Sequence, residues 1–162
     1  MKINIGDIIE IKTKIGFFYA QYTHKDDENG ALIRVTKNCF DRRPSDLQEI
    51  VDAEVGIITF FPLSIAIHRK IFPLIGNLPV PKQRQKFPVF RVRGHVDREG
   101  RVKQWKFWNG EKTWPDKWLT NLTEEQKKLN IAGIWNDTYL IERLEESWTP
   151  ETDLATIRSE CV

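Results

Sequence analysis

The chain has 162 residues, of which 40% are hydrophobic and 30% charged, and its formal net charge is +2. This composition is typical of a globular protein and excludes a collagen-like or intrinsically disordered chain. No window approaches the roughly 18 consecutive apolar residues that a membrane-spanning helix needs, so we expect no membrane association.

Three short runs rich in β-branched and aromatic residues open the chain, at residues 8–13, 17–23 and 31–36. Gly16 separates the first two runs, and an acidic stretch ending in Gly30 separates the last two. Glycine supplies the positive φ angles that tight reversals between strands need. The pattern therefore predicts a three-stranded antiparallel meander.

The middle of the chain is less regular. Residues 47–53 fit either a short helical turn or a connector, and residues 57–61 are predicted to form a buried strand. Alternating apolar positions over 62–72 favour a strand, although periodicity alone leaves a helix open. Prolines in the next stretch, 73–81, predict a loop or a sheet edge, because proline cannot donate to a β-ladder.

Residues 87–96 and 101–108 read as a hairpin around the turn Asp97-Arg98-Glu99-Gly100. A four-residue loop would place apolar side chains on one face and basic ones on the other. The predicted cross-strand pairs are Val92 with Trp105, Phe90 with Phe107, Arg91 with Lys106, and Arg93 with Gln104.

The C-terminal third is predicted to be helical. Trp114-Pro115 is expected to end the strand, and Thr123 and Gln126 have the spacing of a capping box before a short helix. A second helix is capped by Asn136 or Asp137 and runs to about residue 146.

Together these elements predict a β-rich α+β fold, with a curled antiparallel sheet or a partly open SH3-like barrel and one or two short C-terminal helices. The length favours one domain over residues 1–148. Residues 149–162 lack periodicity and are predicted to be a frayed tail.

The sequence also indicates a cellular compartment and limits the chemistry that the protein could carry out. Asp7 and Glu10 interrupt the apolar N-terminus, which argues against a secretory signal, and two distant cysteines, Cys39 and Cys161, favour reduced thiols in the cytoplasm. Zinc-ligand spacing, phosphate loops and nucleophile elbows are all missing. We therefore expect no metal, no cofactor and no catalytic residue; an enzyme with a scattered active site is the least favoured hypothesis.

Two segments resemble the immunity protein 26 family of bacterial polymorphic-toxin systems. The first is Gly6-Asp7-Ile8-Ile9-Glu10-Ile11, followed by Gly16 and Tyr19-Ala20-Gln21-Tyr22; the second leads through Ile65 and Ile67 to Ile75-Gly76-Asn77-Leu78-Pro79. The resemblance covers about residues 3–80. It implies a small bacterial cytoplasmic protein that neutralises a cognate toxin domain by binding it, without a cofactor or turnover.

Charge is unevenly distributed, with 11 basic and 4 acidic residues over 82–118 and 4 basic and 9 acidic over 119–162. The two stretches are either solvated or mutually paired faces, or a nucleic-acid patch with an acidic tail. A nucleic-acid-binding β module is therefore the alternative to toxin binding, although few aromatic side chains would be free to stack on bases. The candidate partner-binding residues are Arg91, Arg93, Lys106, Trp108, Trp114, Trp118, Glu142, Glu145 and Glu146; the oligomeric state cannot be read from this chain.

Overall fold

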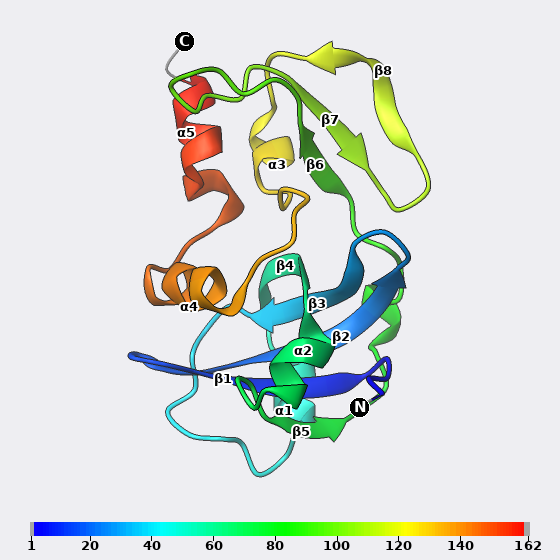
Figure 1. The fold of residues 1–162 in the computed structure, drawn as a ribbon, viewed down its shortest axis with the longest axis vertical. Helices are drawn as coiled ribbons and strands as arrows, with labels where there is room; N and C mark the ends of the chain where they lie inside the picture. Colours follow the sequence, from blue (N-terminus) through cyan, green and yellow to red (C-terminus); the bar gives the residue numbers. More distant parts are fainter. Residues whose placement is uncertain (1, 161–162) are drawn as a thin grey trace. The chain divides into compact units, whose positions relative to one another are not determined.

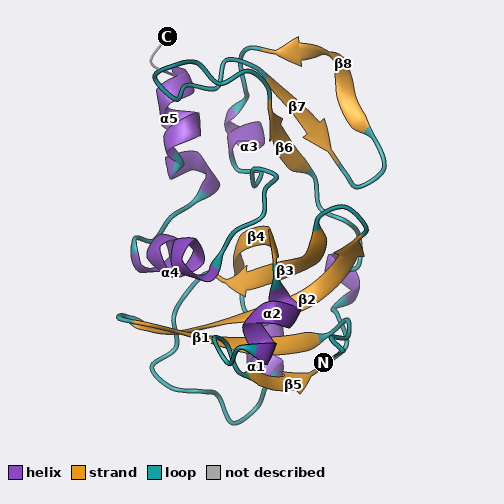
Figure 2. Cartoon of the chain, viewed as in Figure 1, coloured by secondary structure: helices purple, strands orange, loops and turns teal. Residues whose placement is uncertain are grey.

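The computed structural model describes residues 2–160, so Cys161 lies outside the described residues. The fold is α+β and strand-rich, with two antiparallel sheets (Figures 1 and 2). Contacts divide the described chain into two compact units where the sequence analysis expected one domain. The meander unit runs up to Lys86 and includes Gly133–Ser147; the hairpin unit comprises Phe87–Ala132 and the chain from Trp148 onward. No helix among residues 2–160 combines the length and apolar character that crossing a membrane requires.

The sheet of the meander unit confirms the predicted N-terminal strands and the buried strand after Gly56. Its strand order is β4-β3-β2-β1-β5, so the predicted edge at 73–81 is confirmed as well. Residues 7–11 are buried on both faces of the sheet, which explains their nearly continuous apolar sequence. The strands are β1 Asp7–Thr13, β2 Gly16–Asp26, β3 Gly30–Thr36, β4 Val55–Phe61 and β5 Leu74–Asn77.

Two helices of the meander unit pack on this sheet. Residues 47–53, which fitted either a helical turn or a connector, contain the helix α1 (Gln48–Asp52). Its residues Ile50 and Val51 join a buried cluster with Ile8 and Tyr19. The predicted helix α4 (Asp137–Glu145) is confirmed: the Asn136 side chain accepts a hydrogen bond from the Tyr139 backbone. Its buried residues, Leu140 and Leu144, are four apart, as a helix lying on a sheet requires.

The strand favoured over residues 62–72 is wrong, because the segment contains α2 (Leu63–His68). Leu63, Ala66 and Ile67 are buried at helical spacing, whereas Ile65 is 53% exposed. The alternation of isoleucines suggested a strand, but the small Ala66 supplies the third buried position of the helix.

The sheet of the hairpin unit has the order β6-β7-β8, with β6 Phe90–Arg93, β7 Trp105–Trp108 and β8 Thr113–Leu119. The expectation that Trp114-Pro115 ends the strand is wrong, since both residues lie inside β8. The register between β7 and β8 shifts along this stretch. Pro115 therefore sits on an edge strand where no ladder hydrogen bond is required of it.

The predicted hairpin register is wrong by one residue: Phe90 lies opposite Trp108, and Arg91 opposite Phe107. The Asp97 amide donates to the Arg101 carbonyl, which leaves a three-residue loop ending at Gly100 with φ +77°. Such loops favour glycine at the left-handed position. The Asp97 carboxylate reinforces this turn by accepting hydrogen bonds from the Glu99 and Arg101 amides.

The capping box at Thr123 and Gln126 is confirmed at the start of α3 (Glu124–Lys127). The frayed tail predicted from Thr149 is replaced by ordered structure, η2 (Pro150–Thr152) and α5 (Leu154–Glu160). Pro150, Ala155 and Thr156 are buried in this segment, although its sequence shows no amphipathic period.

Arg91 is the contact that attaches this C-terminal segment to the sheet. Its side chain is fully buried, and Nη1 donates to Thr156 Oγ1 at 3.0 Å, Nη2 to the Pro150 carbonyl at 3.0 Å and Nε to the Leu129 carbonyl at 2.9 Å. The guanidinium also lies 4.8 Å from the centre of the Trp105 ring. The buried charge is therefore solvated by protein carbonyls, a hydroxyl and an aromatic ring.

We expect Arg91→Met to lower the free energy of unfolding by about 3 kcal/mol, because two buried acceptors and one part-buried acceptor each lose a hydrogen bond from the guanidinium. Urea denaturation measures this change, and hydrogen exchange shows whether residues 149–157 lose protection. Arg93→Met is the matched control, since Arg93 is exposed and should change stability by less than about 0.5 kcal/mol. Equal effects of the two substitutions would contradict the anchoring role of Arg91.

Candidate interaction surface

The observed hairpin register defines an outer face of the hairpin sheet. Val92 lies opposite Lys106, and Trp108 lies opposite Thr113, so these side chains point to the same side. Trp118 joins them because the Lys106 ammonium lies over its ring. We call Val92, Lys106, Trp108, Thr113 and Trp118 the outer face; Phe90, opposite Trp108, lies on the same side but is fully buried. The opposite side carries the buried Arg91, Trp105 and Phe107.

Trp118 is the most exposed aromatic side chain of the outer face, at 40%. From β8 it reaches across β7 to Gly94, where a Cβ atom would lie 3.0 Å from a ring carbon. Lys106 Nζ lies 4.7 Å from the ring centre. The close approach to Gly94 and the lysine over the ring both restrict the indole, so a partner meets a side chain that has already lost much of its freedom.

Trp108 lies on the same face, but part of its ring packs against other aromatic side chains of the hairpin unit. Phe90 stacks against it at a centroid distance of 5.9 Å, and Phe87 meets it edge-on at 5.2 Å. Its side chain is half-buried. Trp108 therefore supports the outer face and offers less free surface than Trp118.

Trp114 belongs to the other side of β8. It lies opposite Phe107, with ring centroids 6.0 Å apart, and is 38% exposed. The sequence grouped Trp114 with Trp108 and Trp118, but the structure separates it from them across the sheet. Trp114 is therefore an exposed apolar side chain of the edge strand and does not belong to the outer face.

The two hairpin arginines differ sharply in availability. Arg91 cannot reach a partner because it is fully buried, and burial lowers the pKa of its guanidinium to about 10. The expectation that Arg91 binds a partner is therefore wrong, because the observed register, one residue away from the predicted one, turns Arg91 to the buried side of the sheet. Arg93 is exposed, and it lies opposite Trp105 on the side away from the outer face.

The hairpin sheet and its turns carry more basic than acidic side chains. Among the described residues, Arg93, Lys103, Lys106, Lys112 and Lys117 form no ion pair with a carboxylate, whereas Arg101 is bound by Asp97 and Glu99. Glu111 and Asp116 are the exposed carboxylates of the same stretch that no ion pair occupies. Excluding the buried Arg91, residues 87–118 carry seven basic and four acidic side chains, which leaves a local excess of positive charge.

The three glutamates predicted as an acidic binding face lie at the end of α4, in the meander unit. Glu145 accepts a hydrogen bond from the Lys14 amide, and Glu142 and Glu146 lie within 3.8 Å and 3.1 Å of Arg143. Glu142 and Glu146 remain exposed. Arg143 partly neutralises their charge, so this face carries less free negative charge than its sequence suggested.

A charged cluster in the meander unit was missed at the sequence level. Glu10 is buried in β1, accepts a hydrogen bond from the Tyr19 hydroxyl at 3.0 Å, and binds Arg43 through two hydrogen bonds of 2.8 and 2.9 Å. The bond from Arg43 lowers the pKa of Glu10 against the opposing effect of burial. Burial, with the bond to Glu10, raises the pKa of Tyr19. The signal was available, since Glu10 is a charged residue within an apolar strand.

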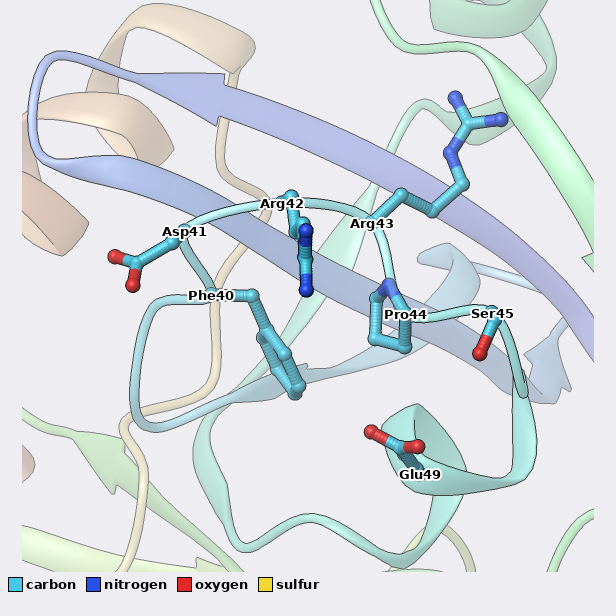
Figure 3. Close-up of a pocket in the computed structure, with 7 residues that line it drawn as sticks. All are labelled: Phe40, Asp41, Arg42, Arg43, Pro44, Ser45 and Glu49. Atoms are coloured by element: carbon cyan, nitrogen blue, oxygen red, sulfur yellow. The ribbon is translucent and has the colours of Figure 1, made fainter.

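The loop that carries Arg43 also lines a surface pocket of about 440 Å³. In Figure 3 the Arg43 side chain extends away from Phe40, Arg42 and Glu49. The Arg43–Glu10 bond therefore ties the loop to β1 and leaves Asp41, Arg42 and Glu49 as the other charged residues of the pocket. The full lining is Phe40, Asp41, Arg42, Arg43, Pro44, Ser45 and Glu49.

No group of three or more potential metal-ligating side chains occurs within residues 2–160. No family model matches the chain, and neither the curated proteins nor the solved structures searched contain a match. The geometry of the hairpin sheet is therefore the main structural basis for a functional proposal.

We expect the stability contributed by Glu10 to depend on pH. Because the pKa of Glu10 is lower in the folded than in the unfolded chain, its ionised form stabilises the fold above the unfolded pKa, and this contribution is lost as the pH falls through the folded pKa. Glu10→Gln should therefore be less stable than wild type near about pH 7, and the difference should shrink towards about pH 3.

Thermal unfolding across that pH range measures the effect. Glu49→Gln is the matched control, because Glu49 is an exposed carboxylate on the neighbouring pocket. A stability difference between Glu10→Gln and wild type that stays constant with pH would contradict the account.

Proposed function

We propose that this protein is a non-catalytic bacterial immunity protein that binds and neutralises a cognate polymorphic-toxin domain in the cytoplasm. The observation that carries the proposal is the outer face of the hairpin sheet, where a half-exposed tryptophan is held under a lysine. Interfaces of this kind are dominated by a few buried aromatic and cationic anchors. Neutralisation by binding requires such a preformed surface and slow dissociation.

The placement of the family-like segments supports the proposal. Asp7 pairs with Asn77, and Ile8 with Gly76, so the two segments that resemble the immunity protein 26 family lie side by side in β1 and β5. The Asp7 carboxylate accepts hydrogen bonds from the Asn4 amide and from Asn77 Nδ2. The resemblance therefore follows one local structural unit, which is what a pattern inherited with a fold would produce.

That unit also explains the residue types. A Cβ atom at Gly6 would collide with the Leu78 carbonyl oxygen, and one at Gly76 would lie 2.5 Å from Leu47 Cδ1. The Leu78 amide donates to the Gly6 carbonyl at 3.1 Å. Glycine is required at Gly6, where φ is +96° and the Leu78 carbonyl leaves no room for a side chain, whereas at Gly76 a Cβ atom would displace only the end of the Leu47 side chain.

A nucleic-acid-binding module is the second candidate function, and the unpaired cations beside Trp118 are the observation in its favour. Cations that contact phosphates and aromatic rings that stack on bases are the usual combination in such modules. Binding to nucleic acid would fall steeply with salt. Tight, strongly salt-dependent binding of an oligonucleotide, without any toxin binding, would favour this second function.

The test of neutralisation is co-expression with the toxin domain encoded beside the gene. We expect the wild-type protein to restore growth and to bind the domain directly. Trp118→Ala should weaken binding by at least about 2 kcal/mol, or about thirtyfold in Kd, because it removes an interface anchor. Calorimetric titration measures Kd, and circular dichroism confirms that the variant is folded.

Ile65→Ala is the control, since Ile65 is an exposed apolar residue of the meander unit. It should leave both growth rescue and Kd unchanged. Failure of the wild-type protein to bind or neutralise the neighbouring toxin domain would overturn the proposed function.

A further inference from the structure

We infer that the outer face recognises an acidic protein surface, and that it does so with side chains and without pairing of β-strands. The inference rests on the proposed function, because it names the chemistry that the bound toxin domain presents. Three properties of the hairpin unit carry it: its unpaired cations, the shape of its edge strand, and the coverage of its aromatic rings.

The charge of the unit selects a negative partner. Lys106 lies within the outer face, whereas Lys112 and Lys117 directly precede Thr113 and Trp118 on the chain and so lie beside that face. None of the three forms an ion pair with a carboxylate among the described residues. Complementary carboxylates on a partner would therefore gain new contacts without breaking existing ones, and the positive field would speed their approach.

The edge strand is poorly shaped for strand addition. Between the pairs Phe107–Trp114 and Trp105–Leu119, β8 advances five residues while β7 advances two, so β8 bulges away from the ladder. Pro115, inside this bulge, has no amide hydrogen to offer a new strand. Bulges and prolines are the usual protections of an edge strand, so recognition falls to the side chains.

The aromatic rings are poorly placed for base stacking. Lys106 covers one face of Trp118, and Phe90 stacks on Trp108. A nucleobase that stacked on either of these covered ring faces would first have to displace the lysine or the phenylalanine. A carboxylate, in contrast, can bind Lys106 Nζ while that group remains over the indole, and apolar atoms of a protein can pack against the exposed part of Trp118.

The test compares three probes with the full-length protein at low salt: a peptide of glutamate and leucine, the same peptide with lysine in place of glutamate, and oligothymidylate. We expect the acidic peptide to shift the indole N–H signal of Trp118 in NMR spectra. We expect the basic peptide to leave the signal unchanged, and oligothymidylate to bind more weakly than the acidic peptide. The signal is assigned with Trp118→Phe.

The variant K106E should weaken binding of the acidic peptide by about fivefold, since an attractive charge becomes repulsive. K12E is the matched control, because Lys12 is exposed on a strand of the meander unit. Absence of acidic-peptide binding, equal binding of the basic peptide, tighter binding of oligothymidylate at Trp118, or equal effects of the two variants would each overturn the inference.

The same variants separate this inference from the proposed function. Neutralisation of the toxin domain by K106E as effectively as by wild type would refute the acidic partner and would not affect the proposed immunity function. Specific acidic-peptide binding by a protein that neutralises no toxin domain would refute the immunity function and leave the chemistry of the surface standing.

Discussion

The register of the β6–β7 hairpin is the constraint on which the hairpin unit depends. The three-residue loop ending at Gly100 sets Phe90 opposite Trp108 and Arg91 opposite Phe107. Side chains alternate along a strand, so a shift of one residue in the register changes which side of the sheet each side chain of β6 shares with its neighbours in β7. This register places Arg91 in the interior and Lys106 on the outer face.

The burial of Arg91 follows from that register and has a structural use. A guanidinium removed from water is costly unless its donors are satisfied, and here carbonyls of two different segments and a hydroxyl accept from it. The C-terminal segment is thereby attached to the sheet by polar contacts that hydrophobic patterning does not reveal. The same arrangement leaves the other side of the sheet available, with Trp118 and Lys106 held in mutual contact.

The sequence predicted what depends on local chemistry: the meander, the cap at Thr123, a helix capped by Asn136 or Asp137, and a loop or sheet edge over 73–81. It failed where the outcome depended on one residue or on distant contacts. The loop at Gly100 was counted one residue too long, and α2 was missed because Ala66 was not counted as a buried position.

The candidate surface was predicted in part. Lys106 and Trp118 were named from sequence and lie together, whereas Arg91 and Trp114 were grouped with them and lie elsewhere. The Glu10–Arg43 bond joins residues 33 apart, which spacing alone does not reveal. Strand pattern identifies candidate side chains, but the exact register and the folding of loops onto the sheet decide which of them meet.

The central claim is that this protein binds its partner through the outer face of the hairpin sheet. The most direct measurement is hydrogen exchange of the chain, free and bound to the toxin domain that we propose as its partner. The account predicts that bound toxin slows exchange along β7 and β8, around Lys106 and Trp118. Slowed exchange confined to α4, or to the loop over residues 40–49, would contradict it.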